Sequence, residues 1–245
     1  MRRFFGQKKD DKIEICDEEF NHLKNVLRLK VGDEVLVSIN TDVEYVCEIE
    51  SFSKNSALCK INGEHKCLLN PTKDITLFQA IAKKPKFEFI VQKATEIGMT
   101  KVVPFVSEYV IAKVTENKIE RLNSIVENAC KQCERSIKTV IDECKNVDQI
   151  IEMFKDYDII LFANERTDVG EEIKKLTKYK KIGIIVGSEG GFSQNEKERF
   201  IEAGAVSVSL GRRILRCETA AVAMMSLVSI MSGNWYENCG FNTWM

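Results

Sequence analysis

The hydrophobic pattern changes its period once along the chain, near residue 70. Residues 17–29 repeat apolar positions at helical spacing, and three runs follow in which apolar and polar residues alternate. These runs cover residues 34–39, 43–51 and 57–61. Alternating runs separated by short polar breaks are typical of strands joined by hairpins. The pattern therefore predicts a small antiparallel barrel over residues 1–70.

Beyond residue 70, strand-like runs alternate with helical ones. The predicted strands are 75–82, 101–106, 140–141, 158–163, 182–186 and 206–210. The predicted helices are 85–97, 117–135, 147–154, 169–177, a segment around Phe200, and 218–231. This alternation is typical of a parallel sheet that is covered by helices on both faces. We therefore expect a second, α/β domain over residues 71–245.

Composition limits the partners of the protein. The 245 residues carry 36 basic and 37 acidic side chains, so a polyanion would have to be bound by a local patch. The nine cysteines and two histidines are scattered, with Cys130 and Cys133 as the one CxxC pair, which does not fit a four-ligand zinc site. No run of about 18 apolar residues or secretory leader is present. We expect a metal-free, cytoplasmic protein with reduced thiols and no membrane segment.

The first motif with chemical content spans residues 184–193, where an apolar strand enters a glycine-rich turn and then a helix. Ser193 and Glu196 have the spacing of a capping box, which predicts where the helix begins. The turn has neither the spacing of a phosphate-binding P-loop nor that of a dinucleotide-binding loop. Taken alone, it fits either a ligand site or a plain tight turn.

The second motif, at residues 210–221, reads Leu-Gly-Arg-Arg-Ile-Leu-Arg-Cys-Glu-Thr-Ala-Ala. Three arginines in five residues, beside a glycine, join a predicted strand to the last helix. Arginine side chains suit phosphate and carboxylate groups. The alternative is a solvated basic loop.

Together the two motifs resemble the cofactor half of SPOUT-class RNA methyltransferases, and more closely the ribosomal RNA small subunit methyltransferase E family, which methylates N3 of one uridine. Four further segments agree with that family in the same order along the chain. They are residues 2–5, 22–28, 93–98 and 132–135. Ser188 stands where the family usually has proline, a change that loosens the restriction on the turn.

The resemblance implies a PUA-like β-barrel over residues 1–70 that places RNA, and a SPOUT α/β domain with a trefoil knot over residues 71–245. It also implies a homodimer with the site at its interface, and S-adenosylmethionine as the cofactor held in the knot. The cofactor contacts carried over are Gly187, Glu189, Gly190, Gly191, Leu210, Gly211, Ile214 and Leu215, with Phe162 as an apolar wall.

The implied reaction needs an unpaired uridine, because N3 lies on the Watson–Crick edge of the base. Arg213 and Arg216 are the candidates for contacting the RNA phosphate or the base edge. Glu218 either orients an arginine or accepts the N3 proton. Glu189 either forms the pocket floor or bonds the backbone of its own loop.

Candidate RNA contacts of the first domain are Arg2, Arg3 and Arg28, and Arg135 either steers RNA or caps its own helix. Residues 83–86, Lys-Lys-Pro-Lys, form a second candidate patch. The expected partner is small-subunit ribosomal RNA or the assembled subunit. Two other functions stay open: methylation of a different RNA, and RNA binding without catalysis.

Overall fold

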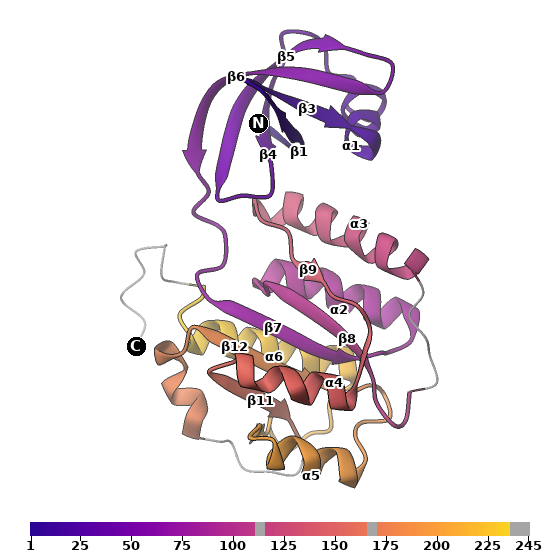
Figure 1. Cartoon of the computed structure of the whole chain (residues 1–245), viewed down its shortest axis with the longest axis vertical. Helices are drawn as coiled ribbons and strands as arrows, with labels where there is room; N and C mark the ends of the chain where they lie inside the picture. The colour runs from indigo at the N-terminus through magenta and orange to yellow at the C-terminus, as the bar shows by residue number, and fades with distance from the viewer. Residues whose placement is uncertain (111–115, 166–170, 236–245) are drawn as a thin grey trace. The chain divides into compact units, whose positions relative to one another are not determined.

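A computed structural model describes residues 1–110, 116–165 and 171–235, and the chain divides into two compact units (Figure 1). The first unit comprises residues 1–70 together with 130–138, and the second comprises 71–129 and the chain from 139 onward. The sequence predicts 130–138 as part of the second domain, whereas in the structure this segment packs with the first unit. The Asn70 carboxamide accepts hydrogen bonds from the backbone of Ser136 and Ile137 at 3.1 and 3.0 Å, which ties this segment to the first unit.

The first unit is a six-stranded sheet with one short helical segment inserted between β3 and β4. Its elements are β1 (Arg2–Phe5), β2 (Gln7–Lys9), β3 (Lys12–Cys16), α1 (Asp17–Asn21), a π-helical turn (His22–Val26), β4 (Glu34–Ser38), β5 (Val43–Phe52) and β6 (Ser56–Lys66). The strand order is β1-β4-β5-β6-β3-β2. Four pairings are antiparallel, but β1 lies parallel to β4, so the sheet is not wholly antiparallel as predicted.

The second unit is a parallel sheet, as the alternation of strands and helices predicts. Its strands are β7 (Asp74–Ala80), β8 (Lys101–Val106), β9 (Val140–Ile141), β10 (Lys145–Asn146), β11 (Ile159–Ala163), β12 (Lys181–Val186) and β13 (Val206–Val208). The order is β10-β8-β7-β12-β11-β13, with β9 beside β8, and every pairing is parallel.

The helical segments of the second unit agree closely with the predicted ones. They are α2 (Lys84–Ile97), α3 (Glu116–Cys133), α4 (Val147–Glu152), two 3-10 segments (Met153–Asp156 and Glu171–Lys178), α5 (Gln194–Glu202) and α6 (Cys217–Met231). Residues 169 and 170 of the predicted helix 169–177 lie outside the described residues. Helix α3 carries the chain out of the second unit and ends in the first.

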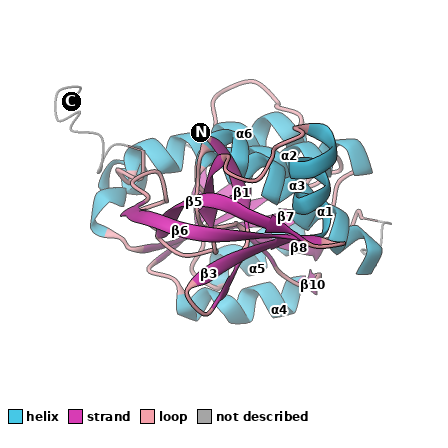
Figure 2. Ribbon diagram, turned by 90° about the horizontal axis from the view of Figure 1, so that it is seen from above, coloured by secondary structure: helices cyan, strands magenta, loops and turns pink. Residues whose placement is uncertain are grey.

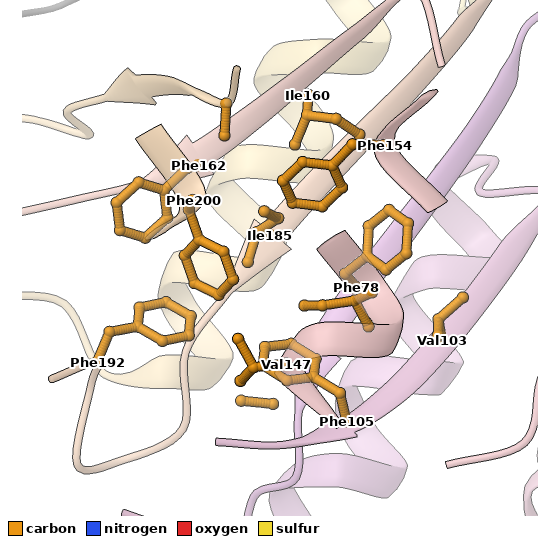
Figure 3. Packing of buried hydrophobic residues seen from close by; sticks show 13 residues of the cluster. Phe78, Val103, Phe105, Val147, Phe154, Ile160, Phe162, Ile185, Phe192 and Phe200 are labelled. Carbon is orange, nitrogen blue, oxygen red and sulfur yellow. The ribbon is translucent and has the colours of Figure 1, made fainter. Parts of the chain in front are cut away.

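Helices cover both faces of the parallel sheet. Figure 2 shows α2 and α6 on one side of the strands and α4 and α5 on the other. Aromatic rings fill the layer under α4 and α5, where Phe78, Phe154, Phe162 and Phe200 pack edge to face or tilted (Figure 3). This layer is the packed hydrophobic core under that face of the sheet.

The strand order determines where a ligand can bind. In open parallel sheets, ligands lie beyond the carboxyl ends of the strands, where loops project from a rigid base. Strands β12, β11 and β13 are neighbours, so the segments that follow them meet at one edge of the sheet. These segments contain both motifs identified in the sequence. The trefoil knot stays a prediction.

Candidate active site

A pocket of about 450 Å³ lies at the carboxyl ends of β11, β12 and β13. Its walls are residues 163–165, 186–192 and most of 210–217, together with Lys86, Lys197 and Ala220. The volume falls within the range of small-molecule sites. The parallel register therefore brings the glycine-rich turn and the arginine segment, about 20 residues apart in sequence, to one cavity.

Hydrogen bonds fix the glycine-rich turn from several directions. Ser193 Oγ accepts the Glu196 N–H at 3.3 Å and the Glu196 carboxylate accepts the Ser193 N–H at 2.9 Å, which confirms the predicted capping box. Below the turn, the buried Gln79 side chain donates to Gly187 O at 3.0 Å. The turn closes through a 3.0 Å bond from Gly191 N to Ser188 O. These bonds define the turn although Ser188 replaces the proline of the family.

The arginine segment forms the facing wall. It turns at Gly211, whose φ of 106° is a conformation that residues with a side chain rarely adopt. The Gly211 N–H donates to Ser209 Oγ at 3.3 Å. Ile214 is 78% exposed at the rim of the pocket. The segment ends at Cys217, where α6 begins.

Eight of the nine residues carried over as cofactor contacts line the pocket. They are Gly187, Glu189, Gly190, Gly191, Leu210, Gly211, Ile214 and Leu215. The prediction for Phe162 was wrong. Its ring is fully buried in the core, with its centroid 5.3 Å from that of Phe192 and 5.5 Å from that of Phe200. The chain reaches the pocket only with the residues after Phe162, which are Ala163 and Asn164.

The three residues predicted to act in catalysis have different surroundings. Arg213 and Arg216 line the pocket and are exposed, and neither forms an ion pair with any residue that the structure describes. Glu218 lies outside the pocket lining and has no arginine partner among the described residues. Its Oε2 lies 3.4 Å from Lys86 Nζ and accepts a hydrogen bond from the Cys217 thiol at 3.2 Å. The expectation that Glu218 orients an arginine is therefore wrong.

Electrostatics make both glutamates near the pocket poor proton acceptors. The pKa of Glu218 lies below its usual value. The main cause is a hydrogen bond from the residue's own backbone N–H at the start of α6, and the Cys217 thiol and Lys86 act in the same direction. Partial burial opposes ionisation of Glu189, but its own N–H, the Lys83 N–H and Lys86 prevail and lower its pKa. Both carboxylates thus stay ionised at neutral pH. Burial, then the hydrogen bond to Glu218, raises the pKa of Cys217 to about 12, so its thiol stays neutral.

Glu189 lies in the pocket lining and also bonds backbone N–H groups, its own and that of Lys83. Its Oε1 accepts the Lys83 N–H at 3.2 Å and lies 3.4 Å from Lys86 Nζ. Lys86 thus belongs to this pocket, although the sequence placed it in a basic patch. Asn164, Glu165 and Lys197 also line the pocket and were not predicted. Asn164 and Glu165 could have been found from the rule that ligands lie beyond strand ends, because both directly follow β11.

The predicted RNA contacts of the first unit divide into two pairs. Arg2 and Arg28 are exposed, and Arg28 has a φ of 55°. The Arg3 side chain is 13% exposed and lies 3.2 Å from Glu44 and 3.8 Å from Glu134, so it holds the unit together. Arg135 is 3% exposed, and burial lowers its pKa. The prediction that Arg3 and Arg135 contact RNA is therefore wrong for this conformation, because neither guanidinium is free to meet a phosphate.

Metal ligands and membrane spans were searched for over residues 1–110, 116–165 and 171–235. Within these ranges, no three His, Cys, Asp or Glu side chains come together in a way that could hold a metal ion. No helix there has the length and apolar character needed to cross a membrane. The cysteines within them are free thiols.

Comparisons with known proteins agree with this geometry. Residues 69–229 match the model of an RNA methyltransferase domain, and residues 8–62 match that of an RNA methyltransferase PUA domain. The ribosomal RNA small subunit methyltransferase E of Bacillus subtilis (strain 168) is 30% identical over 94% of this chain and 96% of its own length. The enzyme of the same name from Buchnera aphidicola subsp. Acyrthosiphon pisum is 33% identical over 90% and 88%.

A solved structure shows the same fold. The crystal structure of a ribosomal RNA small subunit methyltransferase E from Neisseria gonorrhoeae, bound to S-adenosyl methionine, superposes with a TM-score of 0.84. Its sequence is 25% identical, and the match covers 94% of this chain and 98% of that one. Together with the family matches, this confirms the expected fold class of a PUA domain followed by an α/β methyltransferase domain.

Proposed function

Since the chain belongs to the ribosomal RNA small subunit methyltransferase E family, we propose that it transfers a methyl group from S-adenosylmethionine to N3 of one uridine in small-subunit ribosomal RNA. The observation that carries the proposal is the convergence of the glycine-rich turn and the arginine segment on one pocket. The same two motifs carried the family resemblance in the sequence.

The residues of the pocket fit the cofactor. Asn164 Oδ1 and Ser188 Oγ are buried in the lining without a hydrogen-bond partner among the described residues. Such atoms are costly unless a ligand or water satisfies them. A Cβ built on Gly191 or Gly211 would meet no atom within 4 Å, so a ligand can approach the main chain there. Residues 187–191 and 210–215 would hold S-adenosylmethionine, which supplies an electrophilic methyl group on its sulfonium.

The chain's own residues would favour the uridine anion through positive charge. N3 must lose its proton to become nucleophilic, and the resulting charge spreads over the base edge. Glu189 and Glu218 are ionised and contact Lys86, whereas Arg213 and Arg216 are exposed at the pocket and have no ion-pair partner among the described residues. We therefore assign to the two arginines the stabilisation of the negative charge on the base. Hydrogen-bond donors that are aimed at a developing charge stabilise it effectively. We do not assign Glu218 as the acceptor of the N3 proton.

The first unit would place the RNA through Arg2 and Arg28, the two candidate residues that remain exposed. The domain roles predicted for residues 1–70 and 71–245 are part of the proposal, as are the trefoil knot, a homodimer and a cytoplasmic location.

The proposed function is tested by rescue of undermethylated ribosomes. Small subunits assembled in a strain that lacks the gene, incubated with the purified protein and S-adenosylmethionine, should gain one N3-methyluridine in mass spectrometry of the ribosomal RNA. Methylation of transfer RNA or of a ribose hydroxyl would redirect the target. RNA binding without any methyl transfer would support a non-catalytic protein instead.

Arg28 offers a variant that separates RNA binding from stability. A non-glycine residue at φ 55° costs about 1 kcal/mol, a cost that glycine avoids. We expect Arg28→Gly to keep the free energy of unfolding within about 1 kcal/mol of the wild type, because relief of strain offsets the added chain entropy. The same variant should raise the KM for RNA. Denaturant titration and steady-state kinetics measure the two effects.

The matched control is Asp10→Gly, since Asp10 also has a φ of 55° and lies in the turn between β2 and β3. It should keep both stability and the KM for RNA. An unchanged KM in Arg28→Gly would remove Arg28 from the RNA surface.

A further inference from the structure

One ammonium group connects the glycine-rich turn to the start of α6. Lys86 lies in the first turn of α2, and its Nζ is 3.4 Å from Glu189 Oε1 and 3.4 Å from Glu218 Oε2. Glu189 belongs to the glycine-rich turn, whereas Glu218 lies in the first turn of α6, directly after the arginine segment. Lys86 itself lines the pocket. Three segments that are far apart in sequence thus meet at a single charge.

The neighbouring cations do not duplicate this contact. Lys83 reaches Glu189 through its backbone N–H at 3.2 Å, and Lys84 lies 3.9 Å from Glu88 on its own helix. The arginines of the facing wall form no ion pair with Glu189 or Glu218 among the described contacts. Within the part of the chain that the structure describes, the two carboxylates therefore share Lys86 as their ion-pair partner.

We propose that Lys86 is a positioning residue for S-adenosylmethionine binding. This inference rests on the proposed function. Lys86 holds the glycine-rich turn and the start of α6 at the separation that the cofactor requires. It also offsets part of the charge of two carboxylates that would otherwise repel each other more strongly beside the pocket. Its side chain, 31% exposed, turns toward these carboxylates and serves the cofactor site rather than an RNA-binding patch.

The energetic reasoning predicts a specific loss. Each ion pair is partly exposed, so neither contributes much to the stability of the whole protein. Removing the ammonium leaves two uncompensated carboxylates, one in the glycine-rich turn and one at the start of α6. Small displacements of binding groups strongly reduce binding and rate. Arginine keeps the charge and can contact two carboxylates through its planar fork. Methionine keeps most of the length of the side chain and loses only the charge.

The experiment compares Lys86→Met, Lys86→Arg and Lys84→Met. Calorimetry should show that Lys86→Met weakens the binding of S-adenosylmethionine by about tenfold. The KM for the cofactor should rise in parallel, while the KM for RNA stays at the wild-type value. Lys86→Arg should recover most of the affinity. Lys84→Met, which removes an exposed lysine of the same turn, should bind the cofactor like the wild type.

A double variant protects the test against simple misfolding. If repulsion between the carboxylates causes the loss, Glu218→Gln should reduce the effect of Lys86→Met, and Lys86→Met/Glu218→Gln should bind more tightly than Lys86→Met. Wild-type affinity in Lys86→Met, a rise in the KM for RNA alone, or no coupling to Glu218 would each overturn the inference. Failure of the wild-type protein itself to bind S-adenosylmethionine would instead overturn the proposed function.

Discussion

Gly211→Ala is expected to weaken S-adenosylmethionine binding by about 100-fold while the protein still folds. The added methyl group meets no protein atom within 4 Å, so it projects into open space beside the arginine segment. There it would occupy volume that the cofactor needs near the main chain. The φ of 106° is also unfavourable for alanine, which shifts the backbone donors and acceptors of this wall. Calorimetry with the purified protein measures the loss.

Gly204 provides the matched control. Its φ is 93°, a Cβ there also meets no atom within 4 Å, and it lies at the end of α5, outside this pocket. Gly204→Ala and Gly211→Ala should therefore lower the melting temperature by similar amounts, about 2–4 °C for a cost near 1 kcal/mol. Only Gly211→Ala should lose cofactor affinity. Equal affinities in the two variants would remove the arginine segment from the cofactor site.

Alanine at Arg213 or Arg216 is expected to lower kcat for methyl transfer by about 100-fold without changing cofactor affinity. Both side chains are exposed at the pocket and have no ion pair among the described residues, so their loss leaves no buried charge unpaired. The fold should therefore be unaffected. The loss should fall on the step in which negative charge develops on the uridine. Single-turnover kinetics at saturating cofactor and RNA isolate that step.

Arg212 provides the control that separates the effect of an arginine in the pocket from the effect of the segment's net positive charge. It is exposed in the same segment but does not line the pocket. Arg212→Ala removes the same net charge and should keep kcat, with at most a modest change in the KM for RNA. If all three variants lose kcat equally, the segment acts as an undifferentiated basic loop. If Arg213→Ala and Arg216→Ala both retain wild-type turnover, neither arginine stabilises the reacting base.

The sequence predicts the second unit better than the first because its strands have stronger patterns. Residues 101–106 and 140–141 are strands with the expected bounds, and the capping box at Ser193 begins α5. By contrast, β1, β2 and β3 were not predicted. They are only three to five residues long, and β2 is entirely exposed, so their length gives little signal. β3 does alternate, with Ile13 and Ile15 buried, and this pattern was missed. The parallel pairing of β1 with β4 depends on contacts that no local pattern encodes.

In the site, too, residues within local sequence motifs were predicted, whereas contacts between residues far apart in sequence were not. The glycines and arginines were found because they belong to two local motifs that carried the family resemblance. Phe162 and Arg135 were assigned wrongly because residue type does not indicate depth, and both side chains are buried. The pairing of Lys86 with Glu189 and Glu218 joins residues more than 100 positions apart. Only the three-dimensional structure can show that these charges share one place.

The inclusion of residues 130–138 in the first unit affects how the protein is made. Glu19 is 7% exposed, accepts the Phe5 N–H and pairs with Lys131, while Ser136 Oγ donates to Thr41 O at 2.6 Å. Domains generally fold as units, beginning with the N-terminal one as the chain leaves the ribosome. Here all six strands of the N-terminal sheet are synthesised first, but the first unit lacks residues 130–138 until that segment has emerged. During this interval a buried glutamate lacks its lysine, and the first unit is finished only after residues 71–129 of the second unit have been synthesised.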